Sequence, residues 1–363
     1  MDHVFDLSQE RSLAVAAVRA ASAVCRAVQH RLVAGQTLEK GDKSPVTIAD
    51  FASQAIALGL LDSSSSIRKF VGEEDAAALR ADDGKTLREQ VVEQVRTAFD
   101  GSDRNITEDD ALDWIDLGAH EPTGPRDTFW TLDPIDGTKG FLRGEQYAVA
   151  LGLLHQGEVV LGVLGCPNLQ LPDFDAPGCL LVATRGGGAA ALSLEADAPP
   201  SDEGRGNGEA VGETVGEEEA GTPIRVSDID DPAACRFVES VESGHSDHAQ
   251  SEDVAANLGT AAEPVRMDSQ CKYAAVAAAM AEVYLRLPTR QGYEEKVWDH
   301  AAGSIVVQEA GGIVSDVRGE PLDFSRGRTL SANAGVIATH GSLHDRVVDA
   351  VRQVRDHAAP PDA

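Results

Sequence analysis

The sequence predicts a mixed α/β fold, and three observations support this. The first half opens with two stretches of helical periodicity and continues with strands joined by a short turn, whereas the second half alternates helices with strands. Hydrophobic residues make up 42% and charged residues 25% of the 363 residues, a composition typical of a folded chain with a sizeable core. Helices that alternate with strands cover the faces of a sheet, so we expect an α/β sandwich.

Two helices are expected at the start of the chain. Apolar residues recur at helical spacing over residues 13–28, with Asp6 as the N-cap and Gly35 as the end of the helix. A second helix is expected to begin near Thr47, where Asp50 is placed to complete a capping box.

Strands and further helices follow. Short apolar runs indicate strands at residues 70–71, 128–132, 147–154, 158–165 and 180–184. His155, Gln156 and Gly157 separate two of these runs, a length typical of a hairpin turn. In the second half we expect a helix over residues 273–281, a strand over 283–287, a helix over 298–310 and a strand over 313–315.

The chain is strongly acidic, with 60 Asp and Glu against 31 Lys and Arg and a formal net charge of −29. Proteins that bind nucleic acids or anionic membranes normally carry the opposite charge, so we expect neither as a partner. Residues 194–221 hold nine acids and one arginine, and their net charge of −8 leaves −21 for the rest of the chain. Because this stretch is rich in Gly and Glu and lacks aromatic residues, we expect a disordered insertion between two halves, 1–193 and 222–363.

Cysteine usage and the N-terminal residues indicate the compartment. The five cysteines are odd in number and scattered, without a CxxC pair. Residues 1–10 lack the basic and apolar regions of a signal peptide, and no apolar run approaches the ~20 residues of a membrane span. We therefore expect a cytoplasmic protein, and a monomer.

The strongest chemical motif is Asp133-Pro134-Ile135-Asp136-Gly137-Thr138, directly after an expected strand. Asp133, the carbonyl group of Ile135 and Asp136 offer three oxygen ligands, which suit a hard cation such as Mg²⁺. Gly137 lets a phosphate approach the backbone, and Thr138 supplies a hydroxyl group. The alternative is a type I turn, because proline occupies its favoured second position.

Two further acidic clusters fit the same site. Glu73 and Glu74 follow an apolar strand, although a GEED run is also typical of a solvated loop. Asp299 is expected in the first turn of a helix, where capping alone would explain it, and we interpret His300 as structural. Two or three divalent ions, which can bridge a phosphate and activate water, would be held by four carboxylates: Glu73, Asp133, Asp136 and Asp299.

A proton acceptor would complete this site. Asp50 and Thr138 can act together, because a threonine hydroxyl alone is too weak a base, although Asp50 also fits the capping box. Other chemistries lack their motifs: the sequence contains neither GxGxxG nor GxxxxGK[ST], and no glycine-framed nucleophile elbow.

Three motifs together resemble the inositol monophosphatase superfamily of lithium-sensitive, Mg²⁺-dependent phosphatases: Gly72-Glu73-Glu74, the motif from Asp133 to Thr138, and Trp298-Asp299-His300-Ala301-Ala302-Gly303. Five further segments resemble the 3′(2′),5′-bisphosphate nucleotidases within it: residues 43–47, 140–144, 239–246, 268–273 and 284–288. The resemblance covers nearly the whole chain except the acidic insertion. It implies a layered αβαβα sandwich of two sheets.

The resemblance also implies roles for individual residues. The implied metal ligands are Glu73, Asp133, the Ile135 carbonyl, Asp136 and Asp299, with two or three Mg²⁺ ions per site. Asp50 and Thr138 are the implied proton-accepting pair, and Glu74 is implied to orient a water ligand. The implied nucleotide contacts are Thr138, His245, Ser269, Lys272 and Arg286.

Charge and burial indicate how some of these residues could contact the nucleotide. Lys272 and Arg286 offer charge to the phosphate that is retained. Arg286 lies in an apolar strand, where its charge requires a partner. His245 lies in a polar loop and fits an exposed residue equally well.

The implied reaction is hydrolysis of the 3′-phosphate of adenosine 3′,5′-bisphosphate to AMP and phosphate. The resemblance further implies 3′-phosphoadenosine 5′-phosphosulfate as a second substrate and a link to sulfur assimilation. Two alternatives stay open: an inositol (poly)phosphate phosphatase with the same metal ligands, and a non-catalytic sensor of nucleotide or metal. Cys271, where relatives often carry alanine, and the long insertion depart from the family pattern.

Overall fold

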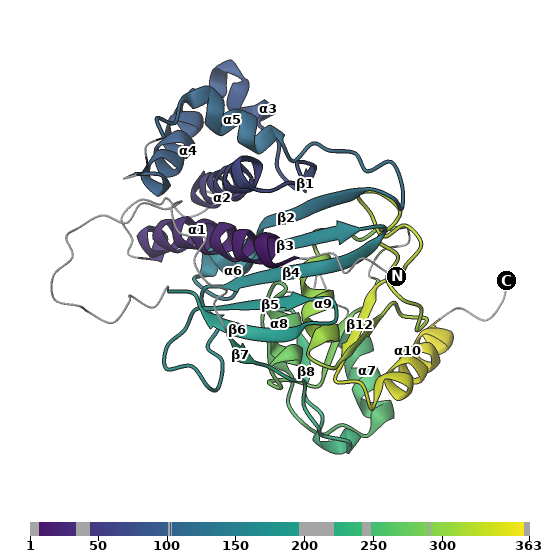
Figure 1. Cartoon of the computed structure of the whole chain (residues 1–363). Helices are drawn as coiled ribbons and strands as arrows, with labels where there is room; N and C mark the ends of the chain where they lie inside the picture. Colours follow the sequence, from purple (N-terminus) through teal and green to yellow (C-terminus); the bar gives the residue numbers. More distant parts are fainter. Residues whose placement is uncertain are drawn as a thin grey trace.

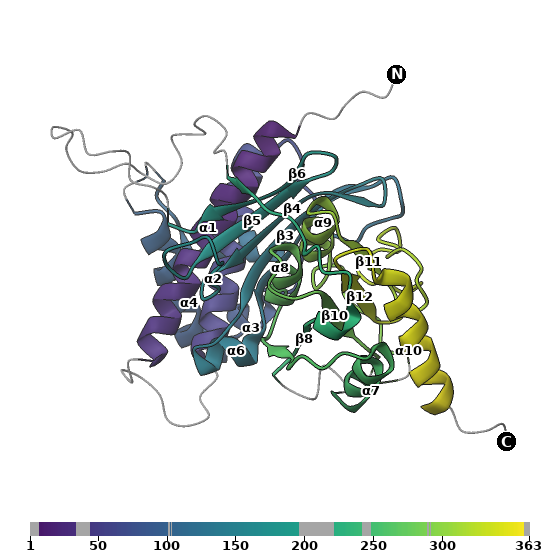
Figure 2. The ribbon, with the colours of Figure 1, turned by 90° about the horizontal axis from the view of Figure 1, so that it is seen from below.

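Two β-sheets and three layers of helices stack in the order αβαβα (Figure 1, Figure 2). The computed structural model describes residues 7–33, 44–100, 102, 104–195, 221–241, 248–288, 290 and 292–358. The layered α/β sandwich expected from the sequence is confirmed. The predicted insertion falls almost entirely on residues 196–220, which lie outside the described residues, so its disorder and the division into two halves stay predictions.

The first helical layer covers one face of the larger sheet. Its two long helices, α1 (Ser8–Val33) and α2 (Ser44–Ser64), pack on each other and on the sheet. Three shorter helices lie beyond α2, with a 3₁₀ turn at Asp82–Gly84 among them: α3 (Ala77–Arg80), α4 (Lys85–Ala98) and α5 (Glu108–Asp116).

The apolar character of α1 exceeds the expectation from the sequence. By length and composition alone its residues 8–32 could cross a membrane, so the prediction that no apolar run approaches such a span is wrong. Most of this helix is buried, because its apolar face packs on α2 and the larger sheet. These residues therefore form part of the core. The predicted ends of this helix, Asp6 and Gly35, lie outside the described residues.

The seven-stranded sheet follows the order of the chain. Its strands are β1 (Phe70–Gly72), β2 (Thr128–Asp136), β3 (Ala148–His155), β4 (Glu158–Cys166), β5 (Cys179–Thr184), β6 (Gly188–Ser193) and β7 (Thr222–Pro223). β1 pairs with β2 in parallel, and the other neighbours are antiparallel. The predicted hairpin is confirmed, because Gln156 and Gly157 join β3 to β4 with φ angles of 55° and 81°, as a type I′ turn requires.

The five-stranded sheet completes the stack. The middle layer between the two sheets consists of α8 (Cys271–Ala277) and α9 (Ala301–Glu309). In spatial order the strands are β11 (Ile313–Ser315), β12 (Val336–Thr339), β10 (Val283–Arg286), β8 (Phe237–Glu239) and β9 (Val265–Arg266). The outer layer consists of α7 (His248–Leu258) and α10 (His344–Ala358), and a 3₁₀ turn at Pro232–Ala234 precedes β8.

Two helix boundaries near the predicted site differ from the sequence predictions. α2 begins at Ser44, so Thr47 and Asp50 lie inside the helix and the predicted capping box is wrong. α9 begins at Ala301, so Asp299 precedes the helix instead of lying in its first turn. Helix capping therefore explains neither aspartate.

The helix predicted over residues 273–281 is also displaced. α8 covers Cys271–Ala277 and therefore includes Lys272 in its first turn. It ends early because Ala279 adopts the left-handed backbone conformation, with φ of 57°, which an α-helix cannot contain.

Glycines allow the middle layer to pack closely. A Cβ atom on Gly162 of β4 would overlap the side chain of Ile305 and lie 2.8 Å from the carbonyl oxygen of Ala302, both on α9. A Cβ atom on Gly303 of α9 would overlap the ring of Tyr273 on α8. Since backbone atoms cannot move away as a flexible side chain can, a larger residue would push α9 off the sheet.

Replacing Gly162 with valine is therefore expected to lower the free energy of unfolding by about 1–3 kcal/mol, measured by thermal or denaturant unfolding. The matched control is Glu158→Val at the exposed start of the same strand, which should change stability by no more than about 0.5 kcal/mol. Equal stability of the two variants would contradict the close packing of α9 on β4.

Candidate active site

A cavity of about 390 Å³ collects side chains from both halves of the chain. Its wall combines the end of β2 and the start of the following helix, α6 (Thr138–Arg143), with β10 and the residues before α8 and α9. Ten residues predicted for the site line this cavity: Glu73, Asp133, Ile135, Asp136, Gly137, Thr138, Ser269, Lys272, Arg286 and Asp299. The structure brings these residues together, and their individual roles stay predictions.

Two other predicted residues, Asp50 on α2 and Glu74 after β1, are not among the described residues that line the cavity. Both lie close enough to Glu73 for their charges to interact with it. His245 lies outside the described residues. The pairing of Asp50 with Thr138 stays a prediction.

A bulge in β2 turns both aspartates of the central motif toward the cavity. Asp133 pairs with Ala150 of β3 and Asp136 pairs with Ala148, so β2 contains one extra residue between them. Residues three apart in a regular strand face opposite sides of the sheet, and the extra residue reverses this. The strand continues beyond its predicted end at Leu132, and the alternative of a type I turn is wrong.

The corner between β2 and α6 is joined to the loop before α8. Gly137 has a φ of 90°, and a Cβ atom on it would lie 2.8 Å from the Cβ atom of Ser269. The carboxylate of Asp136 accepts a hydrogen bond from the backbone N–H of Gln270 at 2.6 Å. Two segments far apart in the sequence therefore form one continuous wall.

Helix α2 holds the backbone beside the acidic residues. The hydroxyl of Ser53 donates a hydrogen bond to the carbonyl of Pro134 at 3.1 Å. The side-chain amide of Gln54 donates to the carbonyl of Glu74 at 2.6 Å and accepts from its N–H at 3.1 Å. The backbone of the segment that carries Glu73 and Glu74 is therefore held by α2, although Glu73 itself is exposed.

The carboxylates of this cavity repel one another. Burial raises the pKa of Asp133 well above its usual range, and neighbouring carboxylates raise it further, among them Glu73, Asp136 and Asp299. Glu73 opens onto the cavity, yet partial loss of water and the charge of Glu74 raise its pKa to about 7. Burial raises the pKa of Asp299 to about 6.

One oxygen of this group lacks a partner. Oδ1 of Asp133 is buried and accepts no hydrogen bond. A buried, unpaired carboxylate oxygen is costly, and a cation would satisfy it and reduce the repulsion among its neighbours. The donor set consists of carboxylate and carbonyl oxygens, so it fits a hard divalent metal.

Among the described residues, three cationic side chains line the cavity together with the carboxylates: the exposed Lys139, and Lys272 and Arg286. Lys272 is buried, its Nζ atom lies 5.3 Å from the centroid of the Tyr284 ring, and burial lowers its pKa to about 8. Arg286 on β10 lies 2.8 Å from Glu295 and 3.4 Å from Asp299. Arg286 therefore has the ion-pair partners that a charged side chain in an apolar strand requires.

A buried network holds Arg286 in place. Tyr273 Oη lies 2.7 Å from Nδ1 of His300, and Nε2 of His300 lies 3.2 Å from Glu295. Burial alone would raise the pKa of Glu295, but the hydrogen bond and charge of His300 and the charge of Arg286 lower it to about 2. This network gives His300 the structural role expected from the sequence.

The same residues form a compact cluster of metal-ligand types. The ligand atoms of Glu295, Asp299 and His300 lie within 4.8 Å of one another, the only such group of three or more found in the described part of the chain. Because the guanidinium group of Arg286 already pairs with both carboxylates, we interpret this cluster as an ion-pair network.

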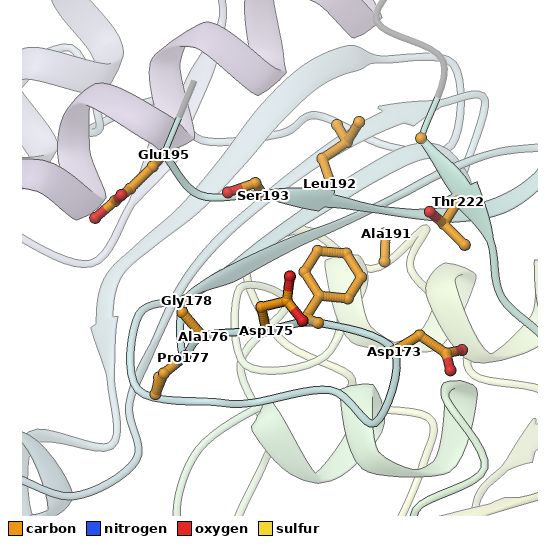
Figure 3. Close-up of a pocket in the computed structure, with 12 residues that line it drawn as sticks. Asp173, Asp175, Ala176, Pro177, Gly178, Ala191, Leu192, Ser193, Glu195 and Thr222 are labelled. Carbon is orange, nitrogen blue, oxygen red and sulfur yellow. The ribbon is translucent and has the colours of Figure 1, made fainter. Parts of the chain in front are cut away.

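A second cavity, of about 420 Å³, lies at the β6–β7 edge of the larger sheet (Figure 3). Its described lining residues include three acids, Asp173, Asp175 and Glu195, and no basic residue. Figure 3 shows these acids spread over different sides of the cavity instead of meeting at one point. Such a wall repels phosphate, so this slightly larger cavity is not a candidate phosphate site.

Comparison with known proteins decides the family. The model of the inositol monophosphatase family matches residues 6–356. The chain belongs to the inositol monophosphatase family. The resemblance drawn from the sequence motifs is confirmed.

Curated relatives of this chain have a name that is more specific than that of the family. The 3′(2′),5′-bisphosphate nucleotidase of Schizosaccharomyces pombe is 39% identical over 358 residues, which cover 95% of each chain. The protein of the same name from Oryza sativa is 41% identical over 373 residues, which cover 97% of each chain. The chain is therefore an enzyme of the phosphatase class.

Solved structures of the inositol monophosphatase family have the same fold. The inositol monophosphatase from Anabaena (Nostoc) sp. PCC 7120 is 21% identical, with a TM-score of 0.56 and 96% of each chain covered. SuhB of Mycobacterium tuberculosis is 18% identical, with a TM-score of 0.57 and coverage of 96% of this chain and 98% of that one. These similarities show the αβαβα architecture.

Six of the described residues that line the cavity were not predicted as site residues: Lys139, Ser240, Asp268, Gln270, Tyr284 and Tyr293. Gln54 and Glu295, which contact residues of the site, were not predicted either. Gln54 lies one helical turn after Asp50, and that spacing is a signal that could have placed both beside the acidic loop. Glu295 lies close in sequence to its partners Arg286 and His300, but no motif joins the three residues.

Replacing Asp133 with asparagine is expected to raise the melting temperature of the metal-free protein by a few degrees, or about 1–2 kcal/mol, because it removes a buried charge that its neighbours repel. The pKa of this group is raised on folding, so its cost develops only above the usual aspartate pKa of about 4. The difference should therefore vanish as the pH falls toward 4. Differential scanning fluorimetry in EDTA measures it.

The control for this substitution is Asp113→Asn, which changes an exposed carboxylate paired with Arg80 and should leave the melting temperature nearly unchanged. Addition of Mg²⁺ should stabilise the unsubstituted chain and the control, but not the Asp133 variant. A less stable Asp133 variant in EDTA at pH 7.5 would contradict the repulsion described above.

Proposed function

We propose that this chain hydrolyses the 3′-phosphate of adenosine 3′,5′-bisphosphate to give AMP and phosphate. The observation that carries this proposal is a single cavity that combines several carboxylates with cationic side chains, among them Lys272 and Arg286. A substrate with two phosphates fits this combination, because the cations can hold one phosphate while metal ions at the carboxylates hold the other. Relatives named 3′(2′),5′-bisphosphate nucleotidase, at 38–41% identity, support the same substrate.

Divalent cations, most simply two or three Mg²⁺ ions, are proposed at the acidic side of the cavity. The proposed ligands are Glu73, Asp133, the Ile135 carbonyl, Asp136 and Asp299. When bound, Mg²⁺ polarises the phosphoryl group and lowers the pKa of water.

Proton transfer is proposed for Asp50, through the hydroxyl of Thr138. Burial and the charges of Glu74 and Glu73 raise the pKa of Asp50, so it accepts a proton more readily than an exposed aspartate does. Thr138 is exposed to the cavity at the start of α6, where its hydroxyl group can contact the attacking water. Glu74, whose backbone Gln54 holds, would orient that water.

The retained 5′-phosphate is proposed to bind Lys272 and Arg286. Both side chains are withdrawn from bulk water, so their charges act on a phosphate with little screening. Ser269 and Gly137 lie beside each other in the same wall, and both are proposed as contacts of the substrate. His245 is proposed as a further contact of the nucleotide.

Three further properties are proposed by analogy with the family. They are inhibition by Li⁺, use of 3′-phosphoadenosine 5′-phosphosulfate as a second substrate and a role in sulfur assimilation. The five cysteines are free and buried, which supports the proposal of a reducing, cytoplasmic location. We also propose that the enzyme acts as a monomer, without a nucleic acid or membrane partner.

The decisive experiment is phosphate release from adenosine 3′,5′-bisphosphate and, separately, from inositol 1-phosphate. We expect Mg²⁺-dependent hydrolysis of the nucleotide with kcat/KM at least tenfold above that for inositol 1-phosphate, because the second phosphate engages the two cations. Li⁺ should reduce the rate. A preference for inositol 1-phosphate would support the alternative of an inositol phosphate phosphatase.

Replacing Lys272 with methionine keeps the side-chain length and removes the charge. We expect KM for the nucleotide to rise about 10–100-fold, because a charge-assisted hydrogen bond is lost, while kinetics on inositol 1-phosphate stay within about twofold. Lys85→Met, at an exposed position on α4, is the control and should leave both substrates unaffected. An equal loss on both substrates would contradict the assignment of Lys272 to the second phosphate.

A further inference from the structure

We propose that Arg328 is a positioning residue that holds the carboxylates of Glu73 and Asp299 at a fixed separation across the two halves of the chain. The proposal rests on the proposed function, because these carboxylates are two of its metal ligands. Arg328 itself does not line the cavity, and nothing in the sequence motifs pointed to it.

The guanidinium group of Arg328 holds the backbone on the Glu73 side. It donates one hydrogen bond to the carbonyl of Gly72, directly before Glu73, at 2.6 Å. It donates two more to the carbonyls of Gly118 at 3.0 Å and His120 at 3.1 Å. The segment around residue 119 in turn forms a bridge to Val71, so one side chain gathers both backbone segments behind Glu73.

The same group holds the Asp299 side through Trp298. The central carbon of the guanidinium group lies 5.0 Å from the centroid of the Trp298 ring, a cation–π contact directly before Asp299. The backbone adds to this contact, because the N–H of Val297 donates to the carbonyl of Arg328 at 3.1 Å. Lys296 and Thr329 also form a β-bridge. Arg328 is therefore attached to the chain on both sides of the acidic cavity.

This attachment opposes a force that the cavity itself generates. Glu73 and Asp299 repel each other, and each approaches the cavity from a segment that is not a regular helix or strand. Without a tie, these two segments could move apart, and ligands of one metal site would lose their common geometry. Residues that orient ligands in this way typically change metal affinity by 10–100-fold when they are replaced.

The shape of arginine suits this role. Its planar group can donate several hydrogen bonds in its plane while its face contacts an aromatic ring. Lysine offers a point charge and cannot reproduce three carbonyl contacts together with the ring contact. The side chain of Arg328 is only 22% exposed, so water replaces these contacts poorly when the guanidinium group is removed.

The test measures metal binding without turnover, with Mn²⁺ as a probe because it prefers the same oxygen ligands. Binding of Mn²⁺ to the full chain is followed by the loss of the free-ion EPR signal. We expect Arg328→Met to weaken Mn²⁺ binding by 10–100-fold and Arg328→Lys to give an intermediate value. Melting temperatures are recorded for each variant with and without the metal.

The matched control is Arg318→Met, in the same connection between β11 and β12. Arg318 donates to the carboxylate of Asp316 and the carbonyl of Ala332, away from the cavity. It should lower the melting temperature without changing Mn²⁺ affinity. If Arg328→Met does not fold, Arg328→Lys decides, because a merely structural role predicts unchanged affinity in that variant once it is folded.

The outcomes separate this proposal from the proposed function. A folded Arg328 variant with unchanged Mn²⁺ affinity would overturn the positioning role alone, provided that the unsubstituted chain binds Mn²⁺ and releases phosphate from the nucleotide. An unsubstituted chain that binds no divalent cation would overturn both. Weakened Mn²⁺ binding in the Arg328 variants, with normal binding in the Arg318 control, would support the positioning role.

Discussion

Mutual repulsion among carboxylates that share one cavity is the constraint on which the rest of the site depends. The fold holds Asp133, Asp136 and Asp299 near one another although their charges oppose this. Neighbouring groups compensate in part: Gln270 donates to Asp136, and Arg286 pairs with Asp299. The remaining repulsion and the unpartnered oxygen of Asp133 favour the entry of cations. The carboxylates therefore already face one cavity before any cation is bound.

The two halves of the chain each contribute both acidic and basic side chains to this cavity. The first half supplies Glu73, Asp133, Asp136 and Lys139, and the second half supplies Asp268, Asp299, Lys272 and Arg286. Neither half contains the whole set, so the site depends on how closely the middle layer packs on the sheet. The absence of a side chain at Gly162 permits that packing, so the geometry of the site depends on a residue of the core.

Local sequence patterns predicted the parts of the fold and site that depend on neighbouring residues. The β3–β4 hairpin follows from turn chemistry, and the motif from Asp133 to Thr138 identified the centre of the cavity. The bulge in β2 could not be predicted, because it appears only in the pairing with β3. The partners of Glu295 and Arg328 are likewise set by tertiary packing: Arg328 donates to Gly72 across 256 residues of sequence. Patterns along the chain carry no record of such contacts. The helices α4 and α10 were also not predicted, although both have buried valines at helical spacing, so the sequence did contain a local signal for them.

The pairing of β6 with β7 has a practical consequence for work on this enzyme. β6 ends at Ser193 and β7 begins at Thr222, and the two strands lie side by side at the edge of the larger sheet. The connection between them thus leaves and rejoins the fold at adjacent points, and doubling its length costs only about 0.6 kcal/mol of closure entropy. The acidic cavity lies beside β1 and β2, several strands away in the order of the sheet. A fluorescent reporter or an affinity handle spliced into this connection would therefore be joined to β6 and β7, and not to the strands that carry the acidic residues.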